Sequence, residues 1–285
     1  YLLNLKRSLS FLKENGMKNL IIGNTSQLSY YFPEDYVRIS SRNIDYNSLT
    51  NKNWDRVFLC FGESRKYITD IKLYDDINFY LTLEIIDKLK HCVKSFVLYS
   101  SCELWNQYDG AIDLSMPFNF YPSPYLHSKY KISKYVMEND EYYNVFVMFP
   151  FNFNSTHRST NFLFGKIFDS IINKKTIEIG DTYFYRDIIH PKFMVEQSIN
   201  SHSHKINGAG RTVFVNDFIR DLYSHYGLNY NDYVIENLNK FNEYEIRKEY
   251  YLKSNDCQYS YNQLFKDTIS DIDKKFNQVK GITLL

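Results

Sequence analysis

Short apolar runs alternate with longer amphipathic stretches through the first half of the chain. The runs are too short for helices, are flanked by polar or small residues and have the character of buried strands, whereas the longer stretches repeat apolar positions every three or four residues. Strands that alternate with helices at this spacing predict a parallel sheet covered on both faces. The predicted strands are 19–23, 36–39, 54–60, 96–99 and 145–149, and the main predicted helices are 76–91 and 125–138.

This alternation predicts an α/β fold, a Rossmann-type doubly wound parallel sheet followed by a smaller mixed region. Residues 17–150 would form the dinucleotide-binding domain, and 151–285 a mainly substrate-binding region that returns to the first domain near 186–200. An amphipathic stretch over 1–15, ended by Gly16, predicts a helical extension at 1–16. Ligands of such sheets bind beyond the carboxyl ends of the strands. We therefore expect the site beside Gly23, Ser40, Gly62, Ser101 and Pro150.

Tyr125 and Lys129 stand four residues apart on one predicted helix, which begins at Ser123-Pro124. A lysine ammonium beside a phenol favours the phenolate, and Ser101 at the end of the preceding strand could bond the same substrate oxygen. This set predicts acid and base catalysis for oxidising an alcohol or reducing a ketone. The chain has 27 tyrosines, so chance pairs occur, and Tyr130 with Lys134 is a second such pair that lacks this context.

The segment after the first strand is a candidate phosphate-binding turn. A strand, a turn and a helix at this place would direct backbone N–H groups at a pyrophosphate. The dinucleotide fingerprint has three glycines, of which only Gly23 remains, and Ser26 and Ser29 occupy the other two positions. A serine at 26 could crowd the phosphates, and an ordinary strand-turn-helix is the alternative. The cofactor contacts predicted here are Gly23, Thr25, Ser26, Gln27 and Leu28.

The end of the second strand predicts the form of the cofactor. An acid at this place selects NAD, whereas arginine and hydroxyl groups accommodate the 2′-phosphate of NADP. The chain has no acid here and carries Arg38, Ser40, Ser41 and Arg42. NADP is therefore expected as the cofactor, with NAD less favoured, and a solvated turn with surface arginines is the alternative.

Composition excludes several other classes of function. A net charge of +1 with interspersed acids and bases gives no footprint for nucleic acid. No stretch has the ~18 apolar residues of a membrane span, and no secretory signal is evident. Four scattered cysteines and seven histidines form no metal-binding spacing, so we expect no metal and a cytoplasmic protein with reduced thiols.

Beyond residue 150 a polar and aromatic loop over 151–158 precedes a predicted helix at 161–173. Arg158 in this loop and Arg186 further along could clamp a diphosphate through bidentate hydrogen bonds. The alternative is that both are surface arginines. The tail after 226 is rich in lysine, tyrosine and asparagine and predicts little.

Several segments together resemble an extended short-chain dehydrogenase/reductase acting on nucleotide sugars, with the greatest similarity to the GDP-mannose 4,6-dehydratases. Ser100 to Trp105 resembles their Ser-Thr-Ser-Glu-Leu-Tyr segment, and Phe151 to Arg158 their Phe-Asn-His-Glu-Ser-Pro-Arg-Arg loop. Residues 180–196, with Arg186-Asp187, resemble their Arg-Asp-Trp-Gly-His-Ala-Lys segment, and 37–41 their Arg-Ser-Ser turn. The resemblance covers residues 17–220.

The resemblance implies a role for each matching residue. Ser101 would orient the substrate oxygen, Tyr125 would be the general base, Lys129 would lower its pKa and hold the nicotinamide ribose, and Glu103 would move the C5 proton. It also implies a nucleotide-diphosphate sugar as substrate, with GDP favoured, and a homodimer formed by helices 76–91 and 125–138. The substrate contacts it implies are Asn152, Asn154, Arg158, Asn161, Lys166 and Arg186.

Three functions remain open at this point. Glu103 and the loop at 151–158 favour a 4,6-dehydratase with no net NADPH consumption. Arg42 and the modest chain length favour a 4-keto-sugar reductase or epimerase that uses the same three catalytic residues. Ser26, Ser29 and the N-terminal stretch favour a non-catalytic member that binds a sugar nucleotide or a partner chain.

Overall fold

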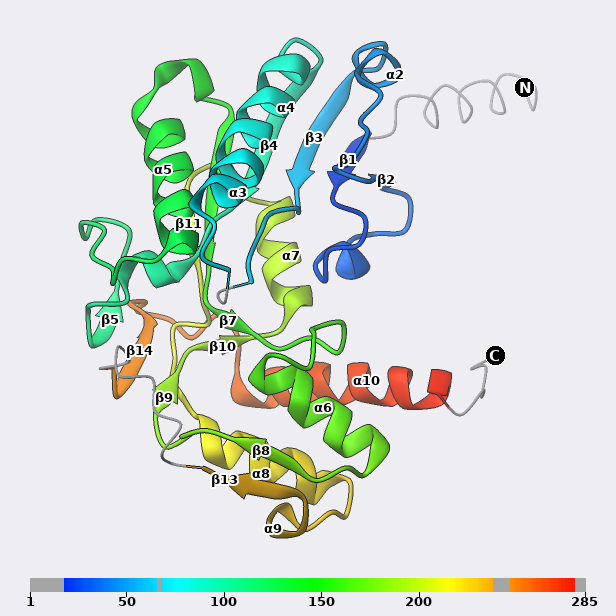
Figure 1. Cartoon of the computed structure of the whole chain (residues 1–285), viewed down its shortest axis with the longest axis vertical. Coiled ribbons are helices and arrows are strands. Elements are labelled where there is room, and N and C mark those ends of the chain that lie inside the picture. Colours follow the sequence, from blue (N-terminus) through cyan, green and yellow to red (C-terminus); the bar gives the residue numbers. More distant parts are fainter. Residues whose placement is uncertain (1–17, 66–67, 238–246, 280–285) are drawn as a thin grey trace, which may run out of the picture.

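A computed structural model of the 285-residue chain describes residues 18–65, 68–237 and 247–279 (Figure 1). The helical extension expected at 1–16 lies outside the described residues. Among the described residues, no helix combines the length and apolar character needed to cross a membrane.

The main sheet has six strands in the order β11-β6-β4-β3-β1-β2, and every neighbouring pair is parallel. The predicted α/β doubly wound fold is therefore confirmed. All five strands predicted in the first half are present, and a sixth joins them from the second half. Their bounds are β1 Asn19–Ile22, β2 Val37–Ile39, β3 Trp54–Leu59, β4 Val93–Tyr99, β6 Val145–Pro150 and β11 Lys205–Asn207.

Alternate residues of the central strands face two separate hydrophobic cores. Leu20, Val57 and Phe96 point toward one face, and their neighbours Ile21 and Phe58 point toward the other. All five side chains are fully buried. This arrangement explains why the central strands appear as continuous apolar runs in the sequence, because a parallel sheet is buried on both sides.

One helix on the first face carries the candidate catalytic residues Tyr125 and Lys129. Helix α5, Pro124–Glu138, begins at the predicted residues because Pro124 occupies its first turn and the Ser123 hydroxyl accepts a hydrogen bond from the Leu126 amide. Beside it, helices α3, Ile71–Asp75, and α4, Leu81–Leu89, are joined by the π-helical turn η2, Asp76–Tyr80. The helix predicted at 76–91 therefore begins one turn earlier and ends two residues earlier.

The connection from β1 to β2 differs from the prediction. In place of the expected helix there is a single 3₁₀ turn, η1, Ser29–Tyr31, followed by Phe32 and Pro33. The 12 residues between Gly23 and Tyr36 leave no room for a helix that crosses the sheet and a loop that returns. The short α2, Tyr46–Thr50, then leads into β3. Helix α7, Pro191–Ile199, lies beside η1 on the second face, where its Met194 and Val195 belong to the same core as Ile21 and Phe58.

The smaller region below the sheet combines four helices with three small sheets (Figure 1). The C-terminal helix α10 packs against α6 and reaches back to the first domain. The helices are α6 Leu163–Asn173, α8 Val215–His225, α9 Tyr230–Tyr233 and α10 Tyr261–Val279. The strands are β5 Gly110–Ile112, β7 Asn152–Phe153, β8 Ile177–Ile179, β9 Tyr185–Arg186, β10 Ile188–Ile189, β12 Val213–Phe214, β13 Val234–Glu236 and β14 Glu249–Leu252.

Candidate active site

Ser101 and Tyr125 meet at the carboxyl end of β4. Ser101 caps the 3₁₀ turn η3, Cys102–Trp105, where its hydroxyl accepts from the Glu103 amide at 3.2 Å. Tyr125 lies in the first turn of α5, and its hydroxyl is close enough to the Ser101 side chain for Ser101 to lower the pKa of Tyr125. Tyr74 packs edge-on against the ring of Tyr125, with 6.3 Å between centroids. The strand end and the helix start thus hold a phenol and a hydroxyl together, as the sequence predicts.

Lys129 lies one turn further along α5 and is buried, with 7% of its surface exposed. Its Nζ donates to the backbone carbonyl of Tyr99 at 2.9 Å. Burial lowers the pKa of Lys129 to about 8, because an ammonium away from water is harder to maintain. An added Cβ at Gly62 would lie 3.4 Å from this Nζ, so the lysine also reaches the loop that follows β3.

Several neighbours set the acidity of Tyr125. Burial is the largest cause and raises its pKa to about 12. The nearby Ser101 hydroxyl and the positive charge of Arg158 lower the pKa of Tyr125, and the carboxylate of Glu103 raises it further. The cation that favours the phenolate in this structure is therefore Arg158, whereas the sequence assigned that effect to Lys129.

Arg158 is held close to the catalytic tyrosine by aromatic rings. Its guanidinium lies over Phe162, 4.0 Å from the ring centroid, and 5.4 Å from that of Phe153. Gly165 permits this loop to pack against α6, since a Cβ there would lie 2.2 Å from the Ser159 carbonyl oxygen. Arg158 thus lies beside the candidate catalytic group, within reach of a substrate held there.

Glu103 forms an ion pair that the sequence does not predict. Arg247 donates to both of its carboxylate oxygens, at 3.3 and 3.2 Å, and the two side chains are 14% and 5% exposed. Arg186 in turn donates to the Arg247 carbonyl at 3.0 Å and is itself buried. The arginine expected to clamp a diphosphate therefore supports the arginine that holds Glu103.

Two serine hydroxyls hold the turn after β1. Ser29 donates to the carbonyls of Asn24 and Ser26 at 2.7 and 2.8 Å, and the Ser26 hydroxyl accepts from the Leu28 amide at 3.3 Å. Gly23 has φ +110°, and a Cβ there would lie 2.8 Å from the Cys60 carbonyl. Among the described residues, no hydrogen bond is made by the amides of Thr25 and Gln27. The turn thus fits an anion such as a pyrophosphate, and the two serines support it from within.

The arginines near β2 have separate surroundings. Arg38 directs its guanidinium at backbone carbonyls of the β1–β2 connection, so its donors serve that connection and not a 2′-phosphate. These carbonyls are those of Ser29, Phe32, Pro33, Glu34 and Tyr36, at 2.8 to 3.3 Å. Ser40, Ser41 and Arg42 form an exposed turn at the carboxyl end of β2, where the Ser40 hydroxyl accepts from the Arg42 amide at 3.0 Å.

The remaining residues proposed for substrate binding are dispersed. Asn154 is fully buried and donates to Thr268 on α10 at 2.7 Å, while Lys166 donates to the Glu178 carbonyl at 3.3 Å. Asn152 is exposed on β7, and Asn161 is exposed before α6. Asn154 and Lys166 thus form hydrogen bonds within the protein, whereas Asn152 and Asn161 are open to solvent.

Three residues that sequence reasoning did not single out support the site, namely Arg247, Tyr31 and Asp271. Their partners lie 144 residues away for Arg247 and 240 residues away for Tyr31. The one local sign of these contacts is that serines replace the second and third glycines after Gly23, so side chains must support the turn. Within the described ranges, no cluster of histidine, cysteine and carboxylate side chains could hold a metal ion.

Comparison with solved structures finds this fold in nucleotide-sugar enzymes. RMD from Pseudomonas aeruginosa with NADPH has a TM-score of 0.72 and 15% identity, covering 90% of this chain and 100% of its own. UDP-N-acetylglucosamine 4-epimerase from Methanobrevibacter ruminantium has a TM-score of 0.75 and 14% identity, covering 91% and 99%.

A third similar structure is dTDP-glucose 4,6-dehydratase from Streptomyces venezuelae with NAD, with a TM-score of 0.72 and 14% identity, covering 92% of this chain and 97% of its own. No family model and no curated protein matches the sequence significantly. At these identities the likeness establishes the fold and leaves the chemistry to the residues of this chain.

Proposed function

We propose that this protein oxidises or reduces a sugar carbon of a nucleotide-diphosphate sugar with NAD(P). The observation that supports this most strongly is the meeting of Ser101 and Tyr125 at the end of β4, with Lys129 buried one turn along α5. The turn after Gly23, at the same end of the sheet, suits a dinucleotide pyrophosphate. These features occur together in the fold shared with nucleotide-sugar enzymes that bind NAD or NADPH.

The residues of this chain would manage the proton and the orientation of the substrate. Ser101 donates to the reacting oxygen, and Tyr125 exchanges a proton with it. Arg158 stabilises the phenolate that forms on Tyr125, and Lys129 would hold the nicotinamide ribose. A bound nicotinamide supplies or accepts the hydride.

NADP and a GDP-linked sugar are the finer parts of the proposal. Arg42 supports NADP, because its side chain lies in the exposed turn at the end of β2 and that turn contains no acid. GDP rests on the resemblance of residues 151–158 to the GDP-mannose 4,6-dehydratases. Arg158 is the better placed of the two predicted diphosphate ligands, since Arg186 bonds backbone carbonyls.

A homodimer through α4 and α5 is also proposed. Tyr80, the last residue of η2 directly before α4, and Tyr135 on α5 are 57% and 42% exposed, which supports an apolar contact there. Light scattering after gel filtration should give twice the chain mass, and a monomer at all concentrations would contradict this.

Reduction or epimerisation is a second candidate, and the Glu103–Arg247 pair favours it. A 4,6-dehydratase needs a base that removes the C5 proton, and both oxygens of Glu103 are bonded to Arg247. Glu103 would act as this base only after Arg247 moved away. A 4-keto-sugar reductase or epimerase requires no such release, because Tyr125 and Ser101 are sufficient for proton transfer at C4.

A panel of substrates separates these possibilities. The purified protein is incubated with GDP-, UDP- and dTDP-hexoses and with their 4-keto derivatives, while nicotinamide absorbance and product mass are followed. A keto product without net NADPH loss supports the dehydratase, and stoichiometric NADPH loss with a keto-sugar supports the reductase. An inverted centre without net NADPH loss supports the epimerase. Absence of turnover with every member would favour the non-catalytic alternative.

Tyr125→Phe tests the catalytic assignment directly. It removes the proton donor and should lower turnover by about 10³-fold or more while leaving the melting temperature nearly unchanged. Tyr130→Phe is the matched control, because Tyr130 lies on the same helix and its hydroxyl accepts from Lys134 at 3.1 Å. Equal loss of activity in both variants would contradict the role of Tyr125.

A further inference from the structure

We propose that Asp271 on the C-terminal helix is a positioning residue that anchors the phosphate-binding turn through Tyr31. The inference rests on the proposed function, because it assigns that turn to a dinucleotide. It extends the cofactor site to α10, a helix more than 200 residues away in the sequence from the turn it supports.

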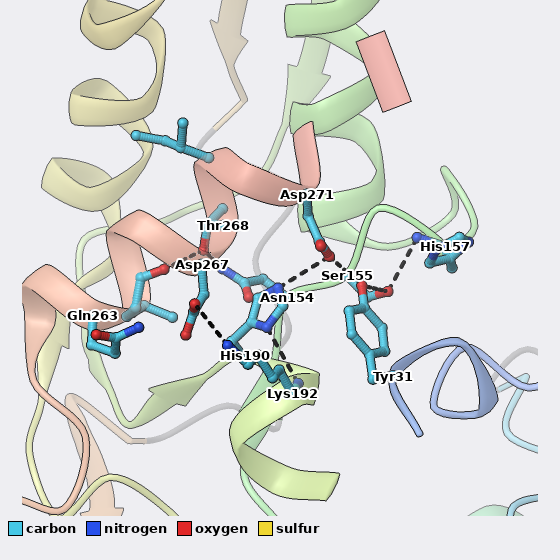
Figure 2. Close-up of polar contacts among 12 residues, drawn as sticks. Tyr31, Asn154, Ser155, His157, His190, Lys192, Gln263, Asp267, Thr268 and Asp271 are labelled. Atoms are coloured by element: carbon cyan, nitrogen blue, oxygen red, sulfur yellow. Dashed lines mark hydrogen bonds and ion pairs between the residues drawn. The ribbon is translucent and has the colours of Figure 1, made fainter. Parts of the chain in front are cut away.

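Tyr31 is the point at which four segments of the chain meet (Figure 2). Its hydroxyl donates to the Asp271 carboxylate and lies 3.1 Å from the Ser155 hydroxyl in the loop after β6. Its ring meets those of His157 and His190 edge-on, with centroids 5.9 and 5.2 Å apart. Burial raises the pKa of Tyr31 above its ordinary value, so the phenol keeps its proton and remains a donor.

Asp271 is fixed from a second side by His190. The Asp271 carboxylate lies 3.1 Å from His190 Nε2, while His190 Nδ1 accepts from the Lys192 amide at 3.2 Å. The Nδ1 contact assigns the hydrogen to Nε2, which therefore donates to Asp271. Burial alone would raise the pKa of Asp271, but the bonds from His190 and Tyr31 hold it below its ordinary value. The carboxylate therefore stays charged at neutral pH.

The anchor reaches the turn through two residues of η1. Ser29, two positions before Tyr31, donates to the Asn24 and Ser26 carbonyls, which lie on either side of the Thr25 amide. A full helix after β1 would normally hold this segment by its own backbone hydrogen bonds. Here η1 has three residues, so its position depends on contacts outside it. Tyr31 supplies one of these outside contacts, because its hydroxyl is bonded to Asp271 on α10.

The neighbouring Tyr30 strengthens the same contact. Its ring stacks on His157, with centroids 3.8 Å apart and planes 2° from parallel. The His157 amide donates to the Ser155 hydroxyl at 3.1 Å, and Lys275 on α10 donates to the Thr156 carbonyl. Ring contacts and hydrogen bonds therefore join the turn, the loop at 155–157 and α10, and we expect cofactor affinity to depend on these contacts.

Tyr31→Phe tests the anchor, with Tyr226→Phe as its matched control. Tyr226 donates through its hydroxyl to Asp273 on the same helix at 2.9 Å and lies far from the turn in sequence. Each change removes one hydroxyl that bonds an α10 carboxylate. We expect Tyr31→Phe to weaken NADPH binding about tenfold, equal to ~1.4 kcal/mol, and Tyr226→Phe to leave it within about twofold at a similar melting temperature.

Hydrogen exchange separates failure of the anchor from failure of the proposed function. Without any cofactor, the amides of residues 24–31 should exchange faster in Tyr31→Phe and in Asp271→Asn than in the wild type. In Tyr226→Phe they should exchange at the wild-type rate. Unchanged exchange in both anchor variants would overturn the inference, whether or not NADPH binds. If exchange is faster in the anchor variants but the wild type binds no dinucleotide, the anchor is supported. The proposed function and the assigned ligand are then rejected. Normal NADPH affinity in Tyr31→Phe would also overturn the inference.

Discussion

The carboxyl ends of β4 and β1 lie at the same edge of one sheet, yet they are built in different ways. Beside β4, a full helix with its own cap presents Tyr125 and Lys129, and their separation is set by the helical repeat. Beside β1, the helix is reduced to η1, and the turn is held by serine hydroxyls, by Arg38 and by Tyr31. Secondary structure positions the candidate catalytic groups, whereas side-chain bonds position the turn after Gly23.

This difference predicts where the molecule tolerates change. The end of β4 depends on local sequence, so loss of a catalytic side chain there should leave the fold intact. The end of β1 depends on contacts far along the chain, so changes there should affect stability and cofactor affinity together. The three predictions below test this contrast, beginning with the largest expected effect.

Gly23→Ala should have the largest effect on the β1 end. The new Cβ would combine a strained φ of +110° with a contact of 2.8 Å to the Cys60 backbone, and we expect a loss of roughly 3 kcal/mol or more of unfolding free energy. Cofactor affinity should fall as well, since the turn must shift. Urea denaturation and NADPH titration measure the two effects.

Gly110→Ala is the control for Gly23→Ala. Gly110 has a similar φ of +93°, but an added Cβ has nothing within 4 Å. Gly110→Ala should lose only about 1 kcal/mol of unfolding free energy, from backbone strain, and should keep normal cofactor affinity. Equal losses in the two variants would mean that strain, and not the close approach to Cys60, explains the need for glycine.

Lys129→Met should stabilise the fold while it abolishes catalysis. The buried ammonium with a pKa of about 8 destabilises the folded state at neutral pH, and its removal should raise the unfolding free energy by roughly 2 kcal/mol after loss of the bond to Tyr99. Denaturation at pH 7 checks this. A less stable variant would show that the ammonium makes a net favourable contribution.

The lowered pKa of Lys129 also predicts how its contribution to the unfolding free energy depends on pH. Between pH 8 and the ordinary lysine value of ~10.4, Lys129 binds more protons in the unfolded chain than in the folded one, so its own contribution to stability should rise with pH across that window. Lys129→Met should lack this rise, and its advantage should disappear above the window. An advantage of Lys129→Met over the wild type that stays constant across the window would contradict the lowered pKa.

Arg158→Gln should have the smallest of the three effects. The Arg158 charge lowers the pKa of Tyr125, so its removal should raise that pKa and move the midpoint for activity upward by about half to one pH unit. Arg158→Lys keeps the charge and should keep the midpoint. A pH profile of kcat distinguishes them, and an unchanged midpoint in Arg158→Gln would mean that the charge acts on the substrate alone.

The strands, α5 and the Ser101, Tyr125 and Lys129 set follow from local pattern. Periodicity and capping act over a few residues, so a single sequence contains them. The absence of a helix after Gly23 was also foreseeable, since Pro33 and the 13-residue spacing to Tyr36 leave no room for one. The fingerprint alone predicts a helix there, because it carries no information about the length of the connection.

The pairings between distant residues could not be predicted in this way. Arg247 meets Glu103 only because β14 lies beside β5, and Asp271 meets Tyr31 only because α10 crosses below the sheet. Arg38, which the sequence assigns to a 2′-phosphate, is directed at carbonyls because the shortened connection exposes them on its side. Such contacts depend on the tertiary arrangement, and no local pattern indicates them.

Equilibrium binding of NADPH and NADH to the purified wild-type protein tests the central claim most directly. We predict one bound dinucleotide per chain, with NADPH bound more tightly than NADH because Arg42 stands at the end of β2 without an acid beside it. No binding of either dinucleotide at millimolar concentration would contradict the account, because the turn after Gly23 would then hold no cofactor and Tyr125 would have no hydride chemistry to assist.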